Sequence, residues 1–521
     1  MRLVRGFAAG IAVIVVGGSV GCGSDGPAAT NNPPPPAAVD HLTVTPSDAS
    51  ITVGATQSFT ATTFDENDAP LSGRTVTWTS SNPSVASISA SGVATGVAAG
   101  IATLVASAEG KTANATVAVM VAAAACKIAG GTNSMRASTI PKPDYLQSVV
   151  DPEFGTTITR ISGDPGTAIP VVGGTWDSSV RADYPKDAVW NADQSLLLLK
   201  HANNPRGSYL FLDGSTYQVQ FGRRGSGLVD DRWHPTMPDI MLAVGSDGTV
   251  SHWNVRTNTS TVKFRPTGYS GASFGDFEGN PSRDGRYVAV QATRASDNHL
   301  VAFVVDVDGG TKFADIDLTA ANVTALDWAS VSATGNYVVV FGTIDNRTQR
   351  TKIFSRTGAE VAYWTNYQFG HFDLGLDPSG NEVAFGGVGG SPNAKQFITR
   401  RLDTGDVSIL SVPTTFDWHS SMRDIARLNW GYAVTNNDDG SPYDGEIFAV
   451  KLDGSGVSGA GIERFVHHRS RVTDYEALPM PVPSPDGRRI LFNSNWGDPS
   501  GRPMQAYVVD TRQLCPNGLP Q

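Results

Sequence analysis

One short pattern, a turn of small polar residues followed by an apolar strand, occurs seven times between residues 192 and 492. Counted from positions 193, 239, 284, 334, 379, 429 and 486, successive copies lie 46, 45, 50, 45, 50 and 57 residues apart. This period is typical of one four-stranded blade, and a ring of such blades forms a β-propeller. The repeat therefore predicts a propeller of seven blades. The copies span 192–199, 238–244, 283–290, 333–340, 378–385, 428–434 and 485–492.

The ends of this repeat region predict how the ring closes. Residues 156–161 (TTITRI) precede the first turn by more than thirty residues, and we expect them to supply the outer strand of the last blade. Cys126 and Cys515 bracket the propeller region, 126–515, and would then meet near that seam. A disulfide there would stabilise the fold by about 4–5 kcal/mol on chain-entropy estimates. Two free thiols or a metal-binding pair are the alternative.

The composition limits the classes of partner. With 56 Gly, 31 Pro and only 17% charged residues, the chain favours turns and strands over helices. The net charge is −10, and there is no basic run or basic-aromatic stripe. These features exclude nucleic acid and anionic lipid as expected partners.

The N-terminus has the features of an export signal. Two arginines precede an apolar stretch, 6–20, which is too short to span a bilayer and suits a signal peptide. Ser19-Val20-Gly21-Cys22 resembles a bacterial lipobox, which implies a signal peptide over 1–21 and lipidation of Cys22. Residues 22–39 then form a Pro-rich tether. An ordinary signal peptide, with Cys22 incidental, is the alternative.

Residues 40–121 have the pattern of a β-sandwich. Apolar and polar residues alternate over 42–44, 58–61, 75–78 and 102–105, with turns between these segments. The segments 53–56, 76–86 and 92–100 resemble the bacterial Ig-like domain, group 2, in order and spacing. This resemblance implies a spacer or adhesion module with Trp78 in its core. The predicted fold class is all-β: an Ig-like β-sandwich followed by a seven-bladed β-propeller.

Two motifs of the propeller region resemble known propeller families. The segment 484–494, which contains Ser-Pro-Asp-Gly, is similar to the strand-turn-strand unit of TolB-type propellers. Together with 151–161 it resembles oligogalacturonate lyases and related seven-bladed polysaccharide lyases. The chain departs from the TolB-like pattern because 479–483 contains no histidine before that turn. A metal-binding histidine set is therefore not carried over from the lyases.

Candidate site residues lie just upstream of each turn, on the strands expected to line the central channel. His371, His419, Arg423 and Tyr475 are the candidate catalytic residues. The full set is Tyr184, Lys186, Asp187, Arg232, His234, Asp276, Glu278, Asp327, His371, Asp373, Trp418, His419, Arg423, Tyr475 and Glu476.

Two functions fit these residues. The first is a surface-anchored binding or scaffold lipoprotein of the outer membrane or cell surface, expected to be a monomer, whose propeller recognises an extracellular glycan or a surface protein. Its only contact with a membrane would be the lipid anchor. The second is a polysaccharide lyase that acts on uronate-containing glycans by β-elimination. In that case His371 or His419 would be the base, Arg423 would bind the carboxylate, and Tyr475 would protonate the leaving oxygen.

Two further segments of the sequence could bind a metal ion, but each has a preferred interpretation without one. His467 and His468 are adjacent on an expected strand and point to opposite faces, so we expect them at the surface or channel rim rather than as a chelating pair. The segment 435–440, with Glu446, partly matches an EF-hand loop, although an acidic hairpin loop is the preferred interpretation. No cofactor is assigned, and calcium and manganese are left open.

Overall fold

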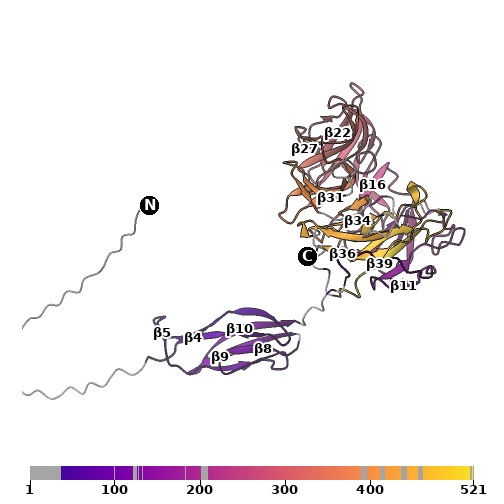
Figure 1. The fold of residues 1–521 in the computed structure, drawn as a ribbon. Coiled ribbons are helices and arrows are strands. Elements are labelled where there is room, and N and C mark those ends of the chain that lie inside the picture. Colours follow the sequence, from indigo (N-terminus) through magenta and orange to yellow (C-terminus); the bar gives the residue numbers. More distant parts are fainter. Residues whose placement is uncertain are drawn as a thin grey trace, which may run out of the picture. The chain divides into compact units, whose positions relative to one another are not determined.

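The computed structural model describes residues 37–98, 100–120, 126, 128–131, 133–181, 184–200, 209–388, 396–410, 417–435, 443–455, 461–516 and 519, with the side chains of 120, 417 and 418 excepted (Figure 1). The predicted signal peptide, the predicted lipidation site Cys22, most of the tether and residues 436–440 of the EF-hand-like segment lie outside these ranges. The chain divides into two compact units between Ala123 and Ala124.

The first unit has three small antiparallel or mixed sheets around one apolar core, as the alternation predicted. Phe59, Leu104 and Val117 are buried there, and Trp78 packs against this core while remaining partly exposed. The sheets are β1 (His41–Thr45), β4 (Thr60–Phe64) and β5 (Pro70–Leu71); β2 (Asp48–Thr52), β10 (Lys111–Met120), β9 (Gly100–Ala108) and β6 (Thr77–Ser80); and β3 (Thr56–Ser58), β8 (Val93–Gly96) and β7 (Ala86–Ile88).

Within the described residues, the second unit contains seven sheets, which we number as blades 1 to 7 in chain order. Blade 1 has β13 (Leu196–Leu199), β14 (Tyr209–Asp213) and β15 (Val219–Arg223). Blade 2 has β16 (Asp230–Trp233), β17 (Ile240–Val244), β18 (Val250–Asn254) and β19 (Thr259–Phe264). Blade 3 has β20 (Tyr269–Ser273), β21 (Tyr287–Arg294), β22 (Leu300–Asp306), β23 (Thr311–Lys312) and β24 (Ile316–Asp317).

The remaining four blades complete the ring. Blade 4 has β25 (Val323–Val331), β26 (Tyr337–Ile344), β27 (Arg347–Ser355) and β28 (Glu360–Trp364). Blade 5 has β29 (Phe369–Leu376), β30 (Glu382–Val388), β31 (Gln396–Arg401) and β32 (Val407–Ile409). Blade 6 has β33 (Asp417–Ser421), β34 (Trp430–Thr435), β35 (Glu446–Lys451) and β36 (Ile462–His467). Blade 7 has β37 (Val482–Pro483), β38 (Arg489–Ser494), β39 (Gln505–Asp510), β12 (Thr157–Arg160) and β11 (Ser148–Val150).

The seven sequence repeats become the first strand of blade 1, β13, and the second strand of each of the other blades: β17, β21, β26, β30, β34 and β38. Their apolar side chains are buried between neighbouring blades, where they form the core clusters of the propeller. The turn before β38 shows why glycine recurs in the pattern. Gly487 has φ +70°, and a Cβ atom there would overlap the Tyr432 side chain of the preceding blade. The predicted fold class, with seven blades, is confirmed.

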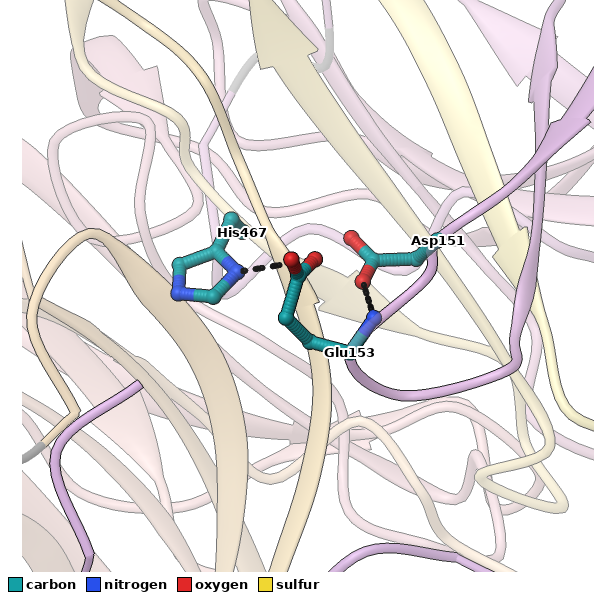
Figure 2. A group of neighbouring side chains, drawn as sticks. All are labelled: Asp151, Glu153 and His467. Atoms are coloured by element: carbon teal, nitrogen blue, oxygen red, sulfur yellow. Dashed lines mark hydrogen bonds and ion pairs between the residues drawn. The ribbon is translucent and has the colours of Figure 1, made fainter. Parts of the chain in front are cut away.

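Ring closure follows the predicted route. The N-terminal β12 pairs antiparallel with β39, with Thr157 opposite Asp510 and Arg160 opposite Tyr507, and β11 adds a fifth strand. The turn between β11 and β12 carries Asp151 and Glu153, which lie beside His467 of blade 6 (Figure 2).

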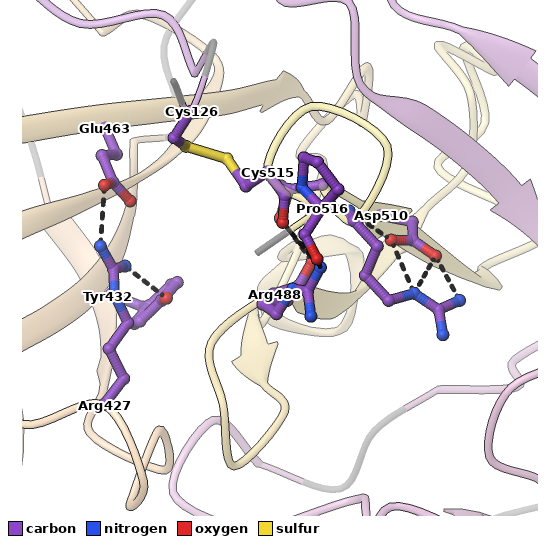
Figure 3. The surroundings of a disulfide bond; sticks show 10 residues. Cys126, Arg427, Tyr432, Glu463, Arg488, Asp510, Cys515 and Pro516 are labelled. Atoms are coloured by element: carbon purple, nitrogen blue, oxygen red, sulfur yellow. Dashed lines mark hydrogen bonds and ion pairs between the residues drawn. A yellow bond between two sulfur atoms is a disulfide. The ribbon is translucent and has the colours of Figure 1, made fainter. Parts of the chain in front are cut away.

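A disulfide joins Cys126 to Cys515, which are 389 positions apart in the sequence (Figure 3). Beside it, the Arg488 side chain donates to the carbonyl of Cys515 at 2.7 Å, and Arg427 pairs with Glu463 at 2.7 Å. The cross-link therefore holds the start of the second unit against the end of blade 7. The described part of the chain contains no helix with the length and apolarity needed to cross a bilayer.

Candidate functional site

Polar and aromatic side chains from several blades meet on the propeller axis, and we call this group the channel cluster. Tyr184, in the segment that precedes β13 of blade 1, contacts His371 of blade 5, although these blades are not neighbours in the ring. Such a contact is expected only where the first strands converge around the axis. The channel cluster comprises Tyr184, Lys186, Glu278, His371, His419 and Tyr475.

Two imidazoles form the centre of the cluster. The rings of His371, on β29, and His419, on β33, stack with centroids 4.6 Å apart. The Tyr184 hydroxyl is hydrogen-bonded to His371 Nδ1 at 2.7 Å, and the Tyr475 hydroxyl lies 3.4 Å from His419 Nε2. Tyr475 belongs to the short 3₁₀ helix η2 (Tyr475–Ala477) and is 50% exposed. The cluster therefore runs from the buried His419 and the partly buried His371 to a side chain at the surface.

The cluster also contains one buried ion pair. Lys186 Nζ lies 2.6 Å from a carboxylate oxygen of Glu278, and its side chain is only 4% exposed. The same ammonium lies 3.7 Å from the ring centroid of Trp328, in a cation–π contact. Burial, followed by the charge of Glu278, raises the pKa of the neighbouring Asp327 carboxyl. The positive charge of Lys186 is therefore balanced inside the protein by the carboxylate of Glu278.

Burial keeps the imidazoles uncharged at neutral pH. Burial, with a smaller effect from Lys186, lowers the pKa of His371 to about 4. Burial also lowers the pKa of His419, and the neighbouring His371 adds to that effect. The pKa of the Tyr184 hydroxyl is raised by burial and then by Glu278. At neutral pH the cluster thus offers neutral hydrogen-bond donors and acceptors and aromatic faces.

Arg423, the candidate for binding a substrate carboxylate, binds Asp373, and within the described residues no hydrogen bond or ion pair joins it to His371 or His419. It follows the end of β33, where its Nε and Nη2 atoms bind both carboxylate oxygens of Asp373 at 3.0 and 2.9 Å. Asp373 is almost completely buried, so this guanidinium neutralises an internal charge. Arg423 also lines a small cavity with Arg232 and Arg283.

Several other candidate site residues make internal contacts that support the fold. Arg232 is paired with both Asp187 (3.0 Å) and Asp230 (2.5 Å) in a buried network between blades 1 and 2. Nδ1 of His234 accepts the backbone N–H of Met237 at 3.2 Å, in the turn that follows β16. Sequence reasoning missed Trp328, whose position directly after Asp327 on the first strand of blade 4 was the available signal.

The surface location expected for His467 and His468 is wrong, because each is 2% exposed. The start of the second unit, which includes Met135, covers this edge of blade 6. His467 Nε2 donates to the Met135 carbonyl at 3.0 Å. His468 Nε2 donates to the Thr435 carbonyl at 2.9 Å. Glu446, the last position of the EF-hand-like segment, is buried and bound to Arg464 at 2.7 Å. Its carboxylate is therefore committed to an internal ion pair.

Comparison with solved structures finds oligogalacturonate lyases and a β-propeller domain among the similar chains. An oligogalacturonate lyase in complex with manganese matches with a TM-score of 0.48 and 15% identity, over 73% of this chain and 98% of that one. An oligogalacturonate lyase from Vibrio parahaemolyticus matches with a TM-score of 0.46 and 11% identity, over the same shares. The β-propeller domain of a Myceliophteria thermophila protein matches with 12% identity and a TM-score of 0.34, over 63% of this chain and 97% of that one. All three TM-scores are below 0.5, so these likenesses carry no argument about this chain.

Comparison of sequences identifies the first unit. None of the curated proteins matches the chain. The family model of the bacterial Ig-like domain, group 2, matches residues 38–119. Such a domain, together with the disulfide, indicates an extracytoplasmic protein. The N-terminal unit is therefore a group 2 bacterial Ig-like domain, and it precedes a seven-bladed β-propeller.

Proposed function

We propose that the propeller binds an extracellular glycan at the channel cluster. The observation that carries this proposal is the convergence of four neutral rings, Tyr184, His371, His419 and Tyr475, from four separate segments of the propeller. Sugar hydroxyls both donate and accept hydrogen bonds, and sugar rings pack on aromatic faces. Neutral imidazoles and phenols supply these contacts without the desolvation cost of a charge.

The exposure of Tyr475 supports this site as the point of access. Its side chain is half exposed, whereas His419, which it contacts, is fully buried. A ligand that reaches Tyr475 would therefore lie within one side chain of the buried histidines. The basic group of the channel cluster, Lys186, is paired with Glu278, which favours recognition through hydroxyls over recognition of a strongly anionic group.

Elimination on a uronate-containing glycan is the second candidate function. The hydrogen bond between Tyr184 and the neutral His371 favours it, because an uncharged imidazole can accept a proton α to a carboxylate. His371 or His419 would act as the base, and Tyr475 would protonate the leaving oxygen. Arg423 is bound to Asp373, so Lys186 is the cluster's cation for the substrate carboxylate.

Glycan binding by the full-length protein, purified in detergent, tests both candidates. Neutral and uronate-containing oligosaccharides are titrated calorimetrically, and ultraviolet absorbance of unsaturated uronates is followed in the same samples. Binding without absorbance supports recognition, whereas new absorbance supports elimination. The variant His371→Ala/His419→Ala should lose either signal, and His299→Ala, directly before β22 of blade 3, should retain it. No binding and no absorbance with any glycan contradicts both candidates.

We also propose that Cys22 carries the lipid that holds the protein at the outer membrane or cell surface. The support is the lipobox-like sequence 19–22 after an apolar segment. The variant Cys22→Ala should move the protein from the membrane fraction to the soluble fraction. Unchanged detergent partitioning of this variant would contradict the anchor.

A further inference from the structure

A second group of ionisable side chains lies at the outer edge of the propeller, where the N-terminal segment crosses blade 6. Asp151 and Glu153 belong to the turn between β11 and β12, and His467 is the last residue of β36 (Figure 2). One potential ligand atom from each lies within 4.8 Å of the other two. We call these three residues the seam cluster, because they join the start of the second unit to blade 6.

The tautomer of His467 follows from its partner. Nε2 lies 3.0 Å from the Met135 carbonyl, which can only accept, so Nε2 carries the hydrogen. In a neutral imidazole Nδ1 is then an acceptor, and it lies 4.0 Å from Oε2 of Glu153. Among the described residues, neither Nδ1 nor this Oε2 has a hydrogen-bond partner, and His467 is 2% exposed. Two buried acceptors therefore face each other, an arrangement that a positive charge between them would stabilise.

The charges around the cluster leave a negative excess. Asp151 is paired with Arg469 at 2.9 Å, and the same guanidinium lies 3.8 Å from Glu153. Glu446, 3.5 Å from His467 Nε2, is paired with Arg464. These five groups comprise three carboxylates and two guanidiniums.

We propose that Asp151, Glu153 and His467 bind one divalent transition-metal cation of the zinc or manganese class, between Glu153 Oε2 and His467 Nδ1. A separation of 4.0 Å lets one ion lie about 2.0–2.2 Å from each atom. An imidazole with carboxylates suits these metals, whereas calcium takes oxygen ligands. Metal-bound histidines typically donate their other N–H to a carbonyl or carboxylate, as His467 does to Met135.

The surroundings give such an ion access and a role. His467 lines an open cavity of about 550 Å³ together with Ser138 and Trp496, which provides a route for the ion and room for water ligands. The backbone N–H of Ser138 donates to Glu153 at 3.1 Å, so the carboxylate is oriented from the same segment. A bound cation would connect this segment to blade 6 and stabilise the closed ring by mass action.

The propeller contains a natural control. Asp297, His299 and Asp317 also lie within metal-binding distance of one another, but they are more exposed. Arg294 binds both carboxylates at 2.6 Å, and His299 Nδ1 lies 2.8 Å from Asp317. Each of these groups has its partner within the cluster, so the same residue types there carry no argument for a metal.

Metal titration of the full-length, tag-free protein tests the proposal. After treatment with a chelator, the protein is titrated with Zn²⁺ and Mn²⁺ by calorimetry, and its thermal unfolding is followed with and without metal. We expect binding of one equivalent and a metal-dependent rise in the Tm of the propeller. Glu153→Gln should weaken binding at least tenfold, as should His467→Gln, whereas Asp317→Asn in the control cluster should leave it unchanged. If His467→Gln does not fold, Glu153→Gln alone decides.

Arg469→Gln separates a metal site from an internal ion network. Removing the competing guanidinium should strengthen metal binding, even if the metal-free variant is less stable. Cobalt absorbance should also report a nitrogen ligand that is lost in His467→Gln. Absence of metal-dependent heat and of any Tm change in the wild type would overturn the proposal. So would Glu153→Gln binding the metal as tightly as the wild type.

Discussion

The channel cluster and the seam cluster place the same residue type, a buried histidine, in opposite electrostatic settings. At the axis, His371 and His419 are bonded to tyrosine hydroxyls, which are themselves neutral. At the seam, His467 lies between two glutamates, with its N–H fixed by a backbone carbonyl. Burial lowers the pKa in both places. The partners of the imidazole, rather than its burial, therefore distinguish a site for neutral ligands from a site for a cation.

Removing the disulfide should cause the largest loss of unfolding free energy, and this loss should concern the propeller, where the disulfide closes the seam. In Cys126→Ala/Cys515→Ala the unfolded chain gains the entropy of a very long loop, about 4–5 kcal/mol. Urea unfolding of the full chain should show the propeller transition at lower urea, with the Ig-like transition unmoved. Glycan binding at the axis should persist in native conditions. An unchanged propeller midpoint would show that the β12–β39 pairing alone closes the ring.

Breaking one ion pair in each region compares the free-energy cost of leaving a charge unpaired inside the protein. Glu446 and Arg464 are 0% and 1% exposed, so Glu446→Gln leaves a buried guanidinium unpaired and should cost about 3–5 kcal/mol. Glu278 is 23% exposed, and its partner Lys186 keeps the contact with Trp328, so Glu278→Gln should cost about 1.5–3 kcal/mol. Chemical denaturation measures both. A larger cost at Glu278 would reverse the comparison.

A change confined to one hydroxyl should separate binding from stability at the axis. Tyr475→Phe removes the group nearest His419 Nε2 from a half-exposed side chain. We expect glycan affinity to fall about tenfold, the equivalent of about 1.4 kcal/mol, with the unfolding midpoint nearly unchanged. Tyr363→Phe, on the outer strand β28, is the matched control and should alter neither. Equal affinities of Tyr475→Phe and the wild type would remove Tyr475 from the site.

The fold could be predicted from the sequence because its signals are local and repeated. Each copy of the turn–strand pattern predicts one blade. The closure of the ring could be predicted from the segment 156–161 and from Cys126 and Cys515. The site was harder to predict. Residues two positions apart on a strand share its face, but their depth along the axis depends on bulges such as the one between Asp417 and His419.

Arg423 and the seam cluster illustrate contacts that a single sequence does not report. Arg423 looked like a ligand-binding cation, yet its partner Asp373 lies fifty positions earlier on the neighbouring blade. Asp151 and Glu153 are more than three hundred positions from His467, and only ring closure brings them together. Partners of this kind are set by tertiary contacts that a single sequence does not report.

The smallest expected effect is the pH dependence contributed by His371, whose pKa in the folded protein is about 4 rather than the ordinary 6.5. Between these values the unfolded chain binds a proton that the folded protein excludes. The stability from this group is therefore complete above the unfolded pKa and is lost as pH falls toward the folded pKa. From about pH 8 to pH 6 the loss should be about 1 kcal/mol.

In His371→Gln this contribution is absent, so the decline in unfolding free energy over that range should be shallower than in the wild type. The difference between the two proteins reports His371 together with its effect on the pKa of the neighbouring His419, which His371 helps to lower. His468→Gln gives the seam-side comparison, since burial lowers the pKa of His468 to about 3 and its slope has the same sign. Parallel pH profiles for His371→Gln and the wild type would mean that His371 titrates normally in the folded protein. The axis would then hold a protonated imidazole below its ordinary pKa, and the contrast between a neutral axis and a charged seam would fail.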